Sequence, residues 1–205
     1  MKFTYETENR THKYETYEWD NTWIDHPYDD TKRVLYIGDS ISCGTRPFAT
    51  ELADGKMVFD LFGSSKAVDN PYFKDALTVF ANQEEHRDAV IFNNGLHGWH
   101  LEDETEFKEH YEDMVKFILD FFKGAPVAIV LSTYIGIDDL KRVIVRNKVM
   151  SDIAEKHSLP VIDLFTVSEQ AKDLMLQDKV HFTDKGYKAL AEKVVESCLN
   201  LFAEV

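Results

Sequence analysis

The sequence predicts a three-layer α/β/α sandwich with a central five-stranded parallel sheet. The chain has 205 residues, which is enough for one domain with a sizeable core. From residue 33 onward, short β-branched runs alternate with longer segments of helical pattern. Strands separated by helices of this length imply right-handed crossovers, which place helices on both faces of a parallel sheet.

The elements follow in order along the chain. The first strand, predicted at 33–38, contains the apolar run at 34–37 and leads into a Gly-Asp-Ser turn. Segment 104–122 repeats apolar residues at three- and four-residue spacings, as a helix with one buried face does. Thr183 or Asp184 can cap the last helix. Strands are predicted at 33–38, 57–62, 88–94, 126–133 and 160–164, and helices near 46–54, 71–82, 104–122, 138–158 and 184–203.

Residues 1–32 differ in character from the main domain at 33–205. They combine many charges with aromatic residues and show no clear period. We expect an N-terminal arm that packs across the domain, with its aromatic rings as anchors. The alternative is that some of these rings line a substrate groove. The aromatic residues are Tyr5, Tyr14, Tyr17, Trp19, Trp23 and Tyr28.

Charge and composition narrow the classes of partner. A formal net charge of −14 disfavours nucleic acid and anionic membranes, because like charges repel at long range. No apolar run approaches the ~20 residues that a membrane-spanning helix needs. The N-terminus lacks an apolar signal core, so the cytoplasm is the expected compartment. Cys43 and Cys198 lie too far apart in sequence to suggest a disulfide framework.

Ser40 is the first candidate for chemistry. It directly follows a predicted buried strand, and open α/β folds place their chemistry at the carboxyl ends of strands. A serine hydroxyl becomes a useful nucleophile only when a neighbouring base takes its proton. Backbone N–H groups at the same turn could face the oxyanion of an acyl transfer. The alternative is that Ser40 only caps the following helix.

Asp178 and His181 supply the base and the carboxylate that could orient it. They lie in a loop before the last helix, on the same predicted sheet edge as Ser40. An Asp-x-x-His pair arises easily by chance, so the position of this pair is more informative than its spacing. Ser40, His181 and Asp178 together contain the groups of a serine hydrolase triad.

With these motifs in this order, the chain resembles the SGNH, or GDSL, hydrolase family. The resemblance rests on Gly38-Asp39-Ser40-Ile41-Ser42 and on Asp178-x-x-His181, and it covers about residues 33–203. It implies a flavodoxin-like sandwich and a serine esterase that needs no cofactor. Ser42 stands where the α/β-hydrolase elbow has its second glycine, which excludes that motif.

The resemblance also implies an oxyanion hole, in which the Ser40 N–H would take part. The family uses the N–H of a glycine after the second strand, and Gly63 or, with a shifted register, Ser65 occupies that place. After the third strand the family has Gly-x-Asn-Asp, and here the sequence reads Asn94-Gly95-Leu96-His97. Aligning the glycines puts His97 in the place of the asparagine. The third donor is therefore His97 or Asn94.

Asp39, Trp99 and His100 are candidate substrate contacts because they lie beside these motifs. Trp99 could instead be part of the core. The histidines of His97-Gly98-Trp99-His100, with His181, also allow a metal site, but a serine hydrolase needs no metal and we expect none.

Two further features are interpreted as structural. Cys43 is expected to fill space in the first helical turn. Arg146-Asn147 is expected to be solvated surface on the fourth helix.

The leading hypothesis is an esterase that removes a small acyl group, acetyl in particular, from a small-molecule ester. The polar and aromatic residues Trp99 and His100 favour a sugar as the alcohol. The resemblance also allows lipid esters and thioesters. A different class of function is a binding module that keeps the fold without the reaction, which the altered third motif would favour.

Overall fold

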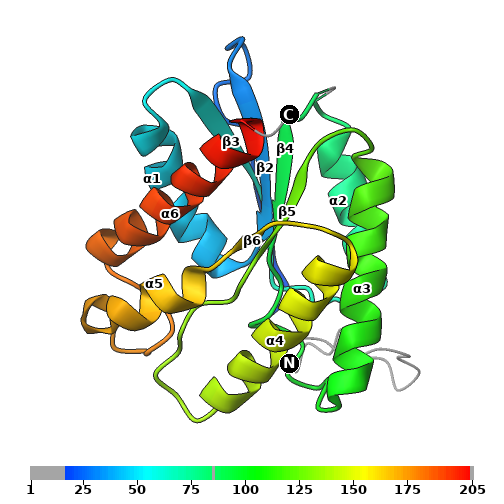
Figure 1. Ribbon diagram of the computed structural model, residues 1–205, viewed down its shortest axis with the longest axis vertical. Coiled ribbons are helices and arrows are strands. Elements are labelled where there is room, and N and C mark those ends of the chain that lie inside the picture. Colours follow the sequence, from blue (N-terminus) through cyan, green and yellow to red (C-terminus); the bar gives the residue numbers. More distant parts are fainter. Residues whose placement is uncertain (1–16, 85, 204–205) are drawn as a thin grey trace, which may run out of the picture.

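The structure is a computed structural model that describes residues 17–84 and 86–203. Tyr5 and Tyr14 of the predicted arm lie outside the described residues. The described part forms three layers, with a mostly parallel sheet between two layers of helices (Figure 1). The predicted α/β/α sandwich is confirmed.

The sheet of the described residues has six strands, one more than predicted. The parallel pairs are β2–β3, β2–β4, β4–β5 and β5–β6, and β1 pairs antiparallel with β3. The extra strand β1 belongs to the predicted arm, so this segment joins the sheet of the main domain. The strands are β1 (Asp20–Trp23), β2 (Lys32–Gly38), β3 (Met57–Ser64), β4 (Ala89–Phe92), β5 (Val127–Val130) and β6 (Val161–Ile162), in the order β1-β3-β2-β4-β5-β6.

Helices cover both faces of the sheet. Helices α1, α5 and α6 pack on one face, and α2, α3 and α4 pack on the other (Figure 1). No described helix combines the length and the apolar character that crossing a membrane requires. The helices are α1 (Ser40–Ala53), α2 (Phe73–Ala81), α3 (Glu104–Phe121), α4 (Leu140–Lys156), α5 (Leu164–Gln170) and α6 (Asp184–Ala203), with a 3₁₀ turn at Lys172–Leu174.

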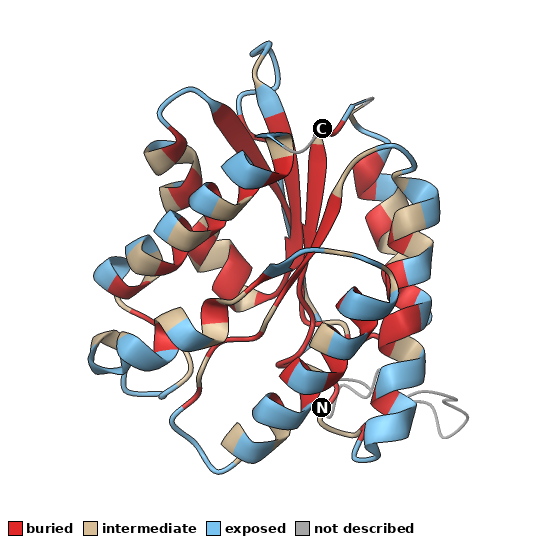
Figure 2. Cartoon of the chain, in the orientation of Figure 1, coloured by how far each residue is buried: buried red, intermediate tan, exposed pale blue. Residues whose placement is uncertain are grey.

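The side chains of β2 show why this strand lies at the centre. Val34 and Tyr36 join the core under α1 and α6, whereas Leu35 and Ile37 join the core under α2 and α3. A strand with both faces buried has a continuous apolar sequence, and 34–37 has one. The buried sheet lies between helices whose outer faces are exposed (Figure 2).

Helix α1 begins at Ser40, well before the predicted start at residue 46. Gly44 and Pro47 have low helix propensity, which is why the sequence suggested a later start. A Cβ at Gly44 would collide with the Tyr187 ring of α6. Glycine at this position therefore lets α1 and α6 approach closely.

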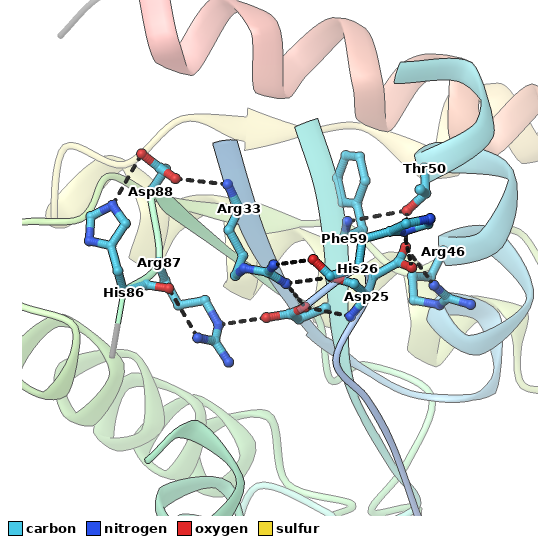
Figure 3. A network of polar contacts seen from close by, with 10 residues as sticks. Asp25, His26, Arg33, Arg46, Thr50, Phe59, His86, Arg87 and Asp88 are labelled. Atoms are coloured by element: carbon cyan, nitrogen blue, oxygen red, sulfur yellow. Dashed lines mark hydrogen bonds and ion pairs between the residues drawn. The ribbon is translucent and has the colours of Figure 1, made fainter. Parts of the chain in front are cut away.

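A buried ionic network holds the segment before β2 against β3 (Figure 3). Asp60 in β3 is fully buried and lies 2.6 Å from Arg33 Nη1 and 2.9 Å from Arg87 Nε. Arg33 also donates to the carbonyl oxygens of Asp25 and His26. Burial raises the pKa of the Asp60 carboxyl, although the Asp25 N–H and both guanidinium groups act in the opposite direction. The network therefore holds the segment before β2 in place, although burying its charged groups costs desolvation free energy.

A second charge cluster connects α3 with α4. Glu112 accepts hydrogen bonds from Lys156 Nζ at 2.6 Å and from His157 Nε2 at 3.1 Å, and Lys116 Nζ lies 3.1 Å away. Hydrogen bonds from Lys156, Lys116 and His157 lower the pKa of Glu112 from 4.5 to about 2. A carboxyl group with a lowered pKa stabilises the fold above its unfolded pKa, and this contribution disappears as pH falls through the folded value.

We therefore expect Glu112→Gln to destabilise the protein above pH 5 and to have little effect near pH 2. The difference in melting temperature from wild type should shrink as pH falls from 4.5 to about 2, because protonation progressively removes the charge of Glu112. Glu109→Gln, at an exposed position on the same helix, is the control. A difference that stays constant with pH would contradict the assigned contribution.

Candidate active site

Ser40 lies where β2 ends and α1 begins. Asp39 precedes it as the helix cap, and its Oδ1 accepts the Ile41 N–H at 2.9 Å. The Ser42 hydroxyl donates to the Asp39 carbonyl at 2.6 Å, and a Cβ at Gly38 would collide with the Ser42 side chain. Ser40 is the first residue of α1, so its N–H has no acceptor within the helix.

His181 lies within hydrogen-bonding distance of Ser40. Its Nε2 is 2.8 Å from Ser40 Oγ, and its Nδ1 is 2.9 Å from Asp178 Oδ2. If Nδ1 carries the proton, Nε2 is free to accept the serine proton. The structure thus brings together the three residues that the sequence singled out as a triad.

The short turn at 178–181 holds the acid in place. Asp178 Oδ1 accepts the N–H groups of Val180 and His181, both at 2.9 Å. Lys179 has a φ of 61°, and its carbonyl accepts the Gly136 N–H at 2.7 Å, which ties the turn to the loop after β5. The turn is therefore held by hydrogen bonds within itself and by one to the loop after β5.

The electrostatics of this turn keep Asp178 charged. Its partial burial alone would raise its pKa, but N–H groups of His181 and Val180 and the His181 ring outweigh that effect and lower it to about 2. The side chains of His181 and Asp178 are 35% and 49% exposed, so an external substrate can approach the imidazole. A carboxylate that stays ionised can stabilise an imidazolium next to it.

Gly63 is placed differently from what the sequence suggested. Strand β3 extends to Ser64, so Gly63 lies inside the strand and not in the loop after it. The Ser65 N–H donates to Trp19 O. In an antiparallel pair, every second residue of a strand directs its N–H toward the partner strand. Gly63 lies two residues before Ser65, so its N–H also faces β1. Neither N–H is directed toward Ser40. A Cβ at Gly63 would collide with Cys43 Sγ, so a residue without a side chain is needed at this position.

His97 and Asn94 lie in the loop that follows β4, beside the Ser40 turn, because β2 and β4 are neighbours in the sheet. Asn94 is fully buried, and its amide nitrogen donates to Lys66 O at 2.8 Å. His97 is half-buried, and its ring meets the Trp19 ring edge to face at 6.4 Å. Asn94 thus fixes the loop after β3, and the His97 ring packs against Trp19.

The three candidate substrate contacts have other neighbours in the structure. Asp39 is 1% exposed and caps α1, which prevents contact with a substrate. Trp99 packs against the core, and the guanidinium groups of Arg142 and Arg146 lie 4.9 and 4.8 Å from its ring. His100 Nε2 lies 2.7 Å from Asp69 Oδ2. In the described part of the chain, no three His, Cys, Asp or Glu side chains gather as a metal site requires.

The expectation that Arg146 and Asn147 form solvated surface was wrong. Both are buried, and they share one face of α4 with Val143 and Met150. Asn147 exchanges hydrogen bonds with the backbone of Ser132 at 2.8 and 2.9 Å. The spacing of 143, 146, 147 and 150 is that of a buried helix face and could have revealed them.

A large cavity lies away from these residues. It measures about 1020 Å³ and is lined by Lys32, Asp88 and Pro126, which precede or begin β2, β4 and β5. This is the amino edge of the parallel strands. Open α/β folds place ligands at the carboxyl edge, where Ser40 and His181 lie.

Solved structures align with this chain over most of its length. A lipase/acylhydrolase from Enterococcus faecalis matches with a TM-score of 0.65 and 19% identity, over 83% of this chain and 96% of that one. A member of the lipolytic protein G-D-S-L family from Veillonella parvula matches with a TM-score of 0.62 and 22% identity, over 81% and 97%. The chain has the SGNH hydrolase fold.

A third structure, that of the acetyl xylan esterase AlAXEase, matches with a TM-score of 0.64 and 15% identity, over 80% of this chain and 98% of that one. No family model matches the sequence, and no curated protein matches it. The resemblance predicted from the end motifs is thus confirmed at the level of the fold.

Proposed function

We propose that this protein is a serine esterase that works through an acyl-serine intermediate. The observation that supports this most directly is the pair of hydrogen bonds from Ser40 Oγ to His181 Nε2 and from His181 Nδ1 to Asp178 Oδ2. A nucleophile within reach of a base, with the base oriented by a third group, is the arrangement that activates a hydroxyl.

In the first half of the reaction, Ser40 Oγ attacks the ester carbonyl while His181 Nε2 takes its proton. The imidazolium then protonates the leaving alkoxide, and the acyl group stays on Ser40. In the second half, His181 takes a proton from water, which attacks the acyl-enzyme. The acid is released and the proton returns to Ser40.

The developing oxyanion needs donors at this edge of the sheet. The Ser40 N–H at the start of α1 is the first, and the positive end of the helix dipole adds to it. We assign His97 as the second, because it lies two residues after Gly95 in the loop beside the Ser40 turn, the place at which the resemblance expects the asparagine donor, and because the Gly63 N–H faces β1. A neutral imidazole can offer one N–H to the oxyanion.

We propose acetyl as the acyl group and a carbohydrate as the alcohol. The SGNH fold of this chain is shared with a protein named as an acetyl xylan esterase, and also with one named as a lipase/acylhydrolase. The large cavity, whose lining mixes charged and apolar residues, is at the opposite edge of the sheet, so it supplies no channel for a long acyl chain at Ser40. A small acyl group fits this arrangement best.

Labelling with a fluorophosphonate probe tests the proposal directly. We expect the wild type to be labelled at Ser40, as shown by mass spectrometry of the modified peptide, because only an activated hydroxyl reacts quickly. Cys43→Ala is the matched control, and it should be labelled equally. Burial raises the pKa of the Cys43 thiol to about 12, so the thiol stays neutral.

Hydrolysis of p-nitrophenyl acetate, butyrate and octanoate, and of acetylated xylo-oligosaccharides, tests the substrate. We expect kcat/KM to be highest for acetyl esters. Faster cleavage of octanoate would contradict the acetyl preference while leaving the esterase proposal in place. An unlabelled, inactive wild type would favour the binding module instead.

A further inference from the structure

The β4–α3 loop, which holds His97, is fastened to the protein by an arginine of α4. Arg146 is 4% exposed, and its guanidinium group points into this loop. Its Nη1 donates to Gly95 O at 3.0 Å and to His97 O at 2.6 Å, and its Nη2 donates to Gly98 O at 2.5 Å and to Leu101 O at 3.3 Å. The turn at 95–98 is thus fixed on both sides of His97.

Two aromatic rings enclose the same guanidinium group. Its carbon lies 4.8 Å from the centre of the Trp99 ring and 4.5 Å from that of the Phe107 ring. Cation–π contacts at desolvated sites stabilise a buried charge and restrict its orientation. The position of Arg146 is therefore set by packing, and the loop backbone is held to it.

We propose that Arg146 is a positioning residue that acts through His97. By holding the carbonyl oxygens of Gly95, His97 and Gly98, it fixes the turn so that the His97 imidazole faces the oxyanion formed at Ser40. This inference rests on the proposed esterase function and on His97 as a donor. Oxyanion stabilisation requires donors that are held in place before the reaction, so small displacements of this turn lower kcat.

Arg142 provides a matched comparison on the same helix. It donates to Trp99 O at 2.8 Å and to Leu101 O at 3.1 Å, and its guanidinium carbon lies 4.9 Å from the Trp99 ring. These contacts are all beyond residue 98. Arg142 thus secures the far end of the same loop without a contact to the His97 turn in the described residues.

Lysine is the informative substitution at both positions. It keeps the positive charge, but replaces the planar fork of five donors by a single ammonium group. We expect Arg146→Lys to lower kcat by about tenfold with little change in KM, since the lost interaction matters in the transition state. Arg142→Lys should keep kcat within about twofold, because the His97 turn keeps its own contacts.

A double-mutant cycle separates positioning from general support of the fold. His97→Ala alone should lower kcat by about 10²-fold, as the loss of one oxyanion donor does. In the His97→Ala background, Arg146→Lys should lower kcat by less than about twofold, because the residue it positions is gone. Melting temperatures of all variants, with assays far below them, exclude partial unfolding as the cause.

Equal losses from Arg146→Lys in both backgrounds would overturn the proposal, and so would full kcat in Arg146→Lys. If Arg146→Lys does not fold, Gly98→Ala decides: Gly98 has a φ of 74°, and a Cβ there would lie 2.9 Å from the Ala67 Cβ. It should displace the same turn and lower kcat only when His97 is present. A wild type without esterase activity would instead refute the proposed function.

Discussion

We expect Ser40→Ala to lower kcat/KM for acetyl esters by about 10³-fold or more, because nucleophile, base and acid act as one unit. Ser40 Oγ is the group within 2.8 Å of His181 Nε2, and removing it leaves the base without a nucleophile to activate. The substitution should leave the fold intact, since the position begins a helix and alanine has high helix propensity.

Circular dichroism and the melting temperature should therefore match those of the wild type, while hydrolysis and fluorophosphonate labelling are both lost. His181→Asn is the companion variant, and it should lose activity to a similar degree. A folded Ser40→Ala protein with more than a hundredth of wild-type activity would show that another group is the nucleophile.

The largest effect on stability is expected for Asp60→Ala. This change leaves the buried guanidinium groups of Arg33 and Arg87 without their carboxylate, 2.6 and 2.9 Å away in the intact protein. Removing one partner of a buried ion pair costs about 3–5 kcal/mol of unfolding free energy. The loss should exceed that from removing the buried volume of so small a side chain.

Urea denaturation measures this effect through the midpoint of unfolding. Asp152→Ala is the control, because Asp152 forms an exposed pair with Lys148 within α4, and exposed pairs contribute little to stability. If Asp60→Ala cost no more than Asp152→Ala, the two arginines would have found other acceptors, and the network would not be what joins residues 25–33 to β3.

The layers of the fold could be predicted because β2 to β6 and the long helices have sequence patterns of their own. Strand β1 could not be predicted, since Asp20–Trp23 is exposed and lacks an apolar pattern, and it is a strand because its backbone pairs with β3. The start of α1 was missed for a related reason. Its first turn is stabilised by the Asp39 cap and by packing against α6, which outweigh the low propensities of Gly44 and Pro47.

Ser40, Asp178 and His181 could be chosen from the sequence because each lies next to an element boundary that the pattern also reveals. The helical spacing around Arg146 could have shown that it is buried, but not what it binds, because its acceptors are backbone carbonyls, which cannot be recognised from the sequence. The direction of the Gly63 N–H could not be predicted from the sequence either, because it depends on how β1 pairs with β3.

The separation of Ser40 and His181 in the sequence also has a consequence for the synthesis and folding of the protein. Ser40 and His181 are separated by 141 positions, so the long segment between them must be synthesised before the hydroxyl can meet its base. Partial chains would be chemically inert toward esters, however well their early strands associate. Recovery of hydrolysis during refolding would then report when the loop that holds His181 reaches the Ser40 turn.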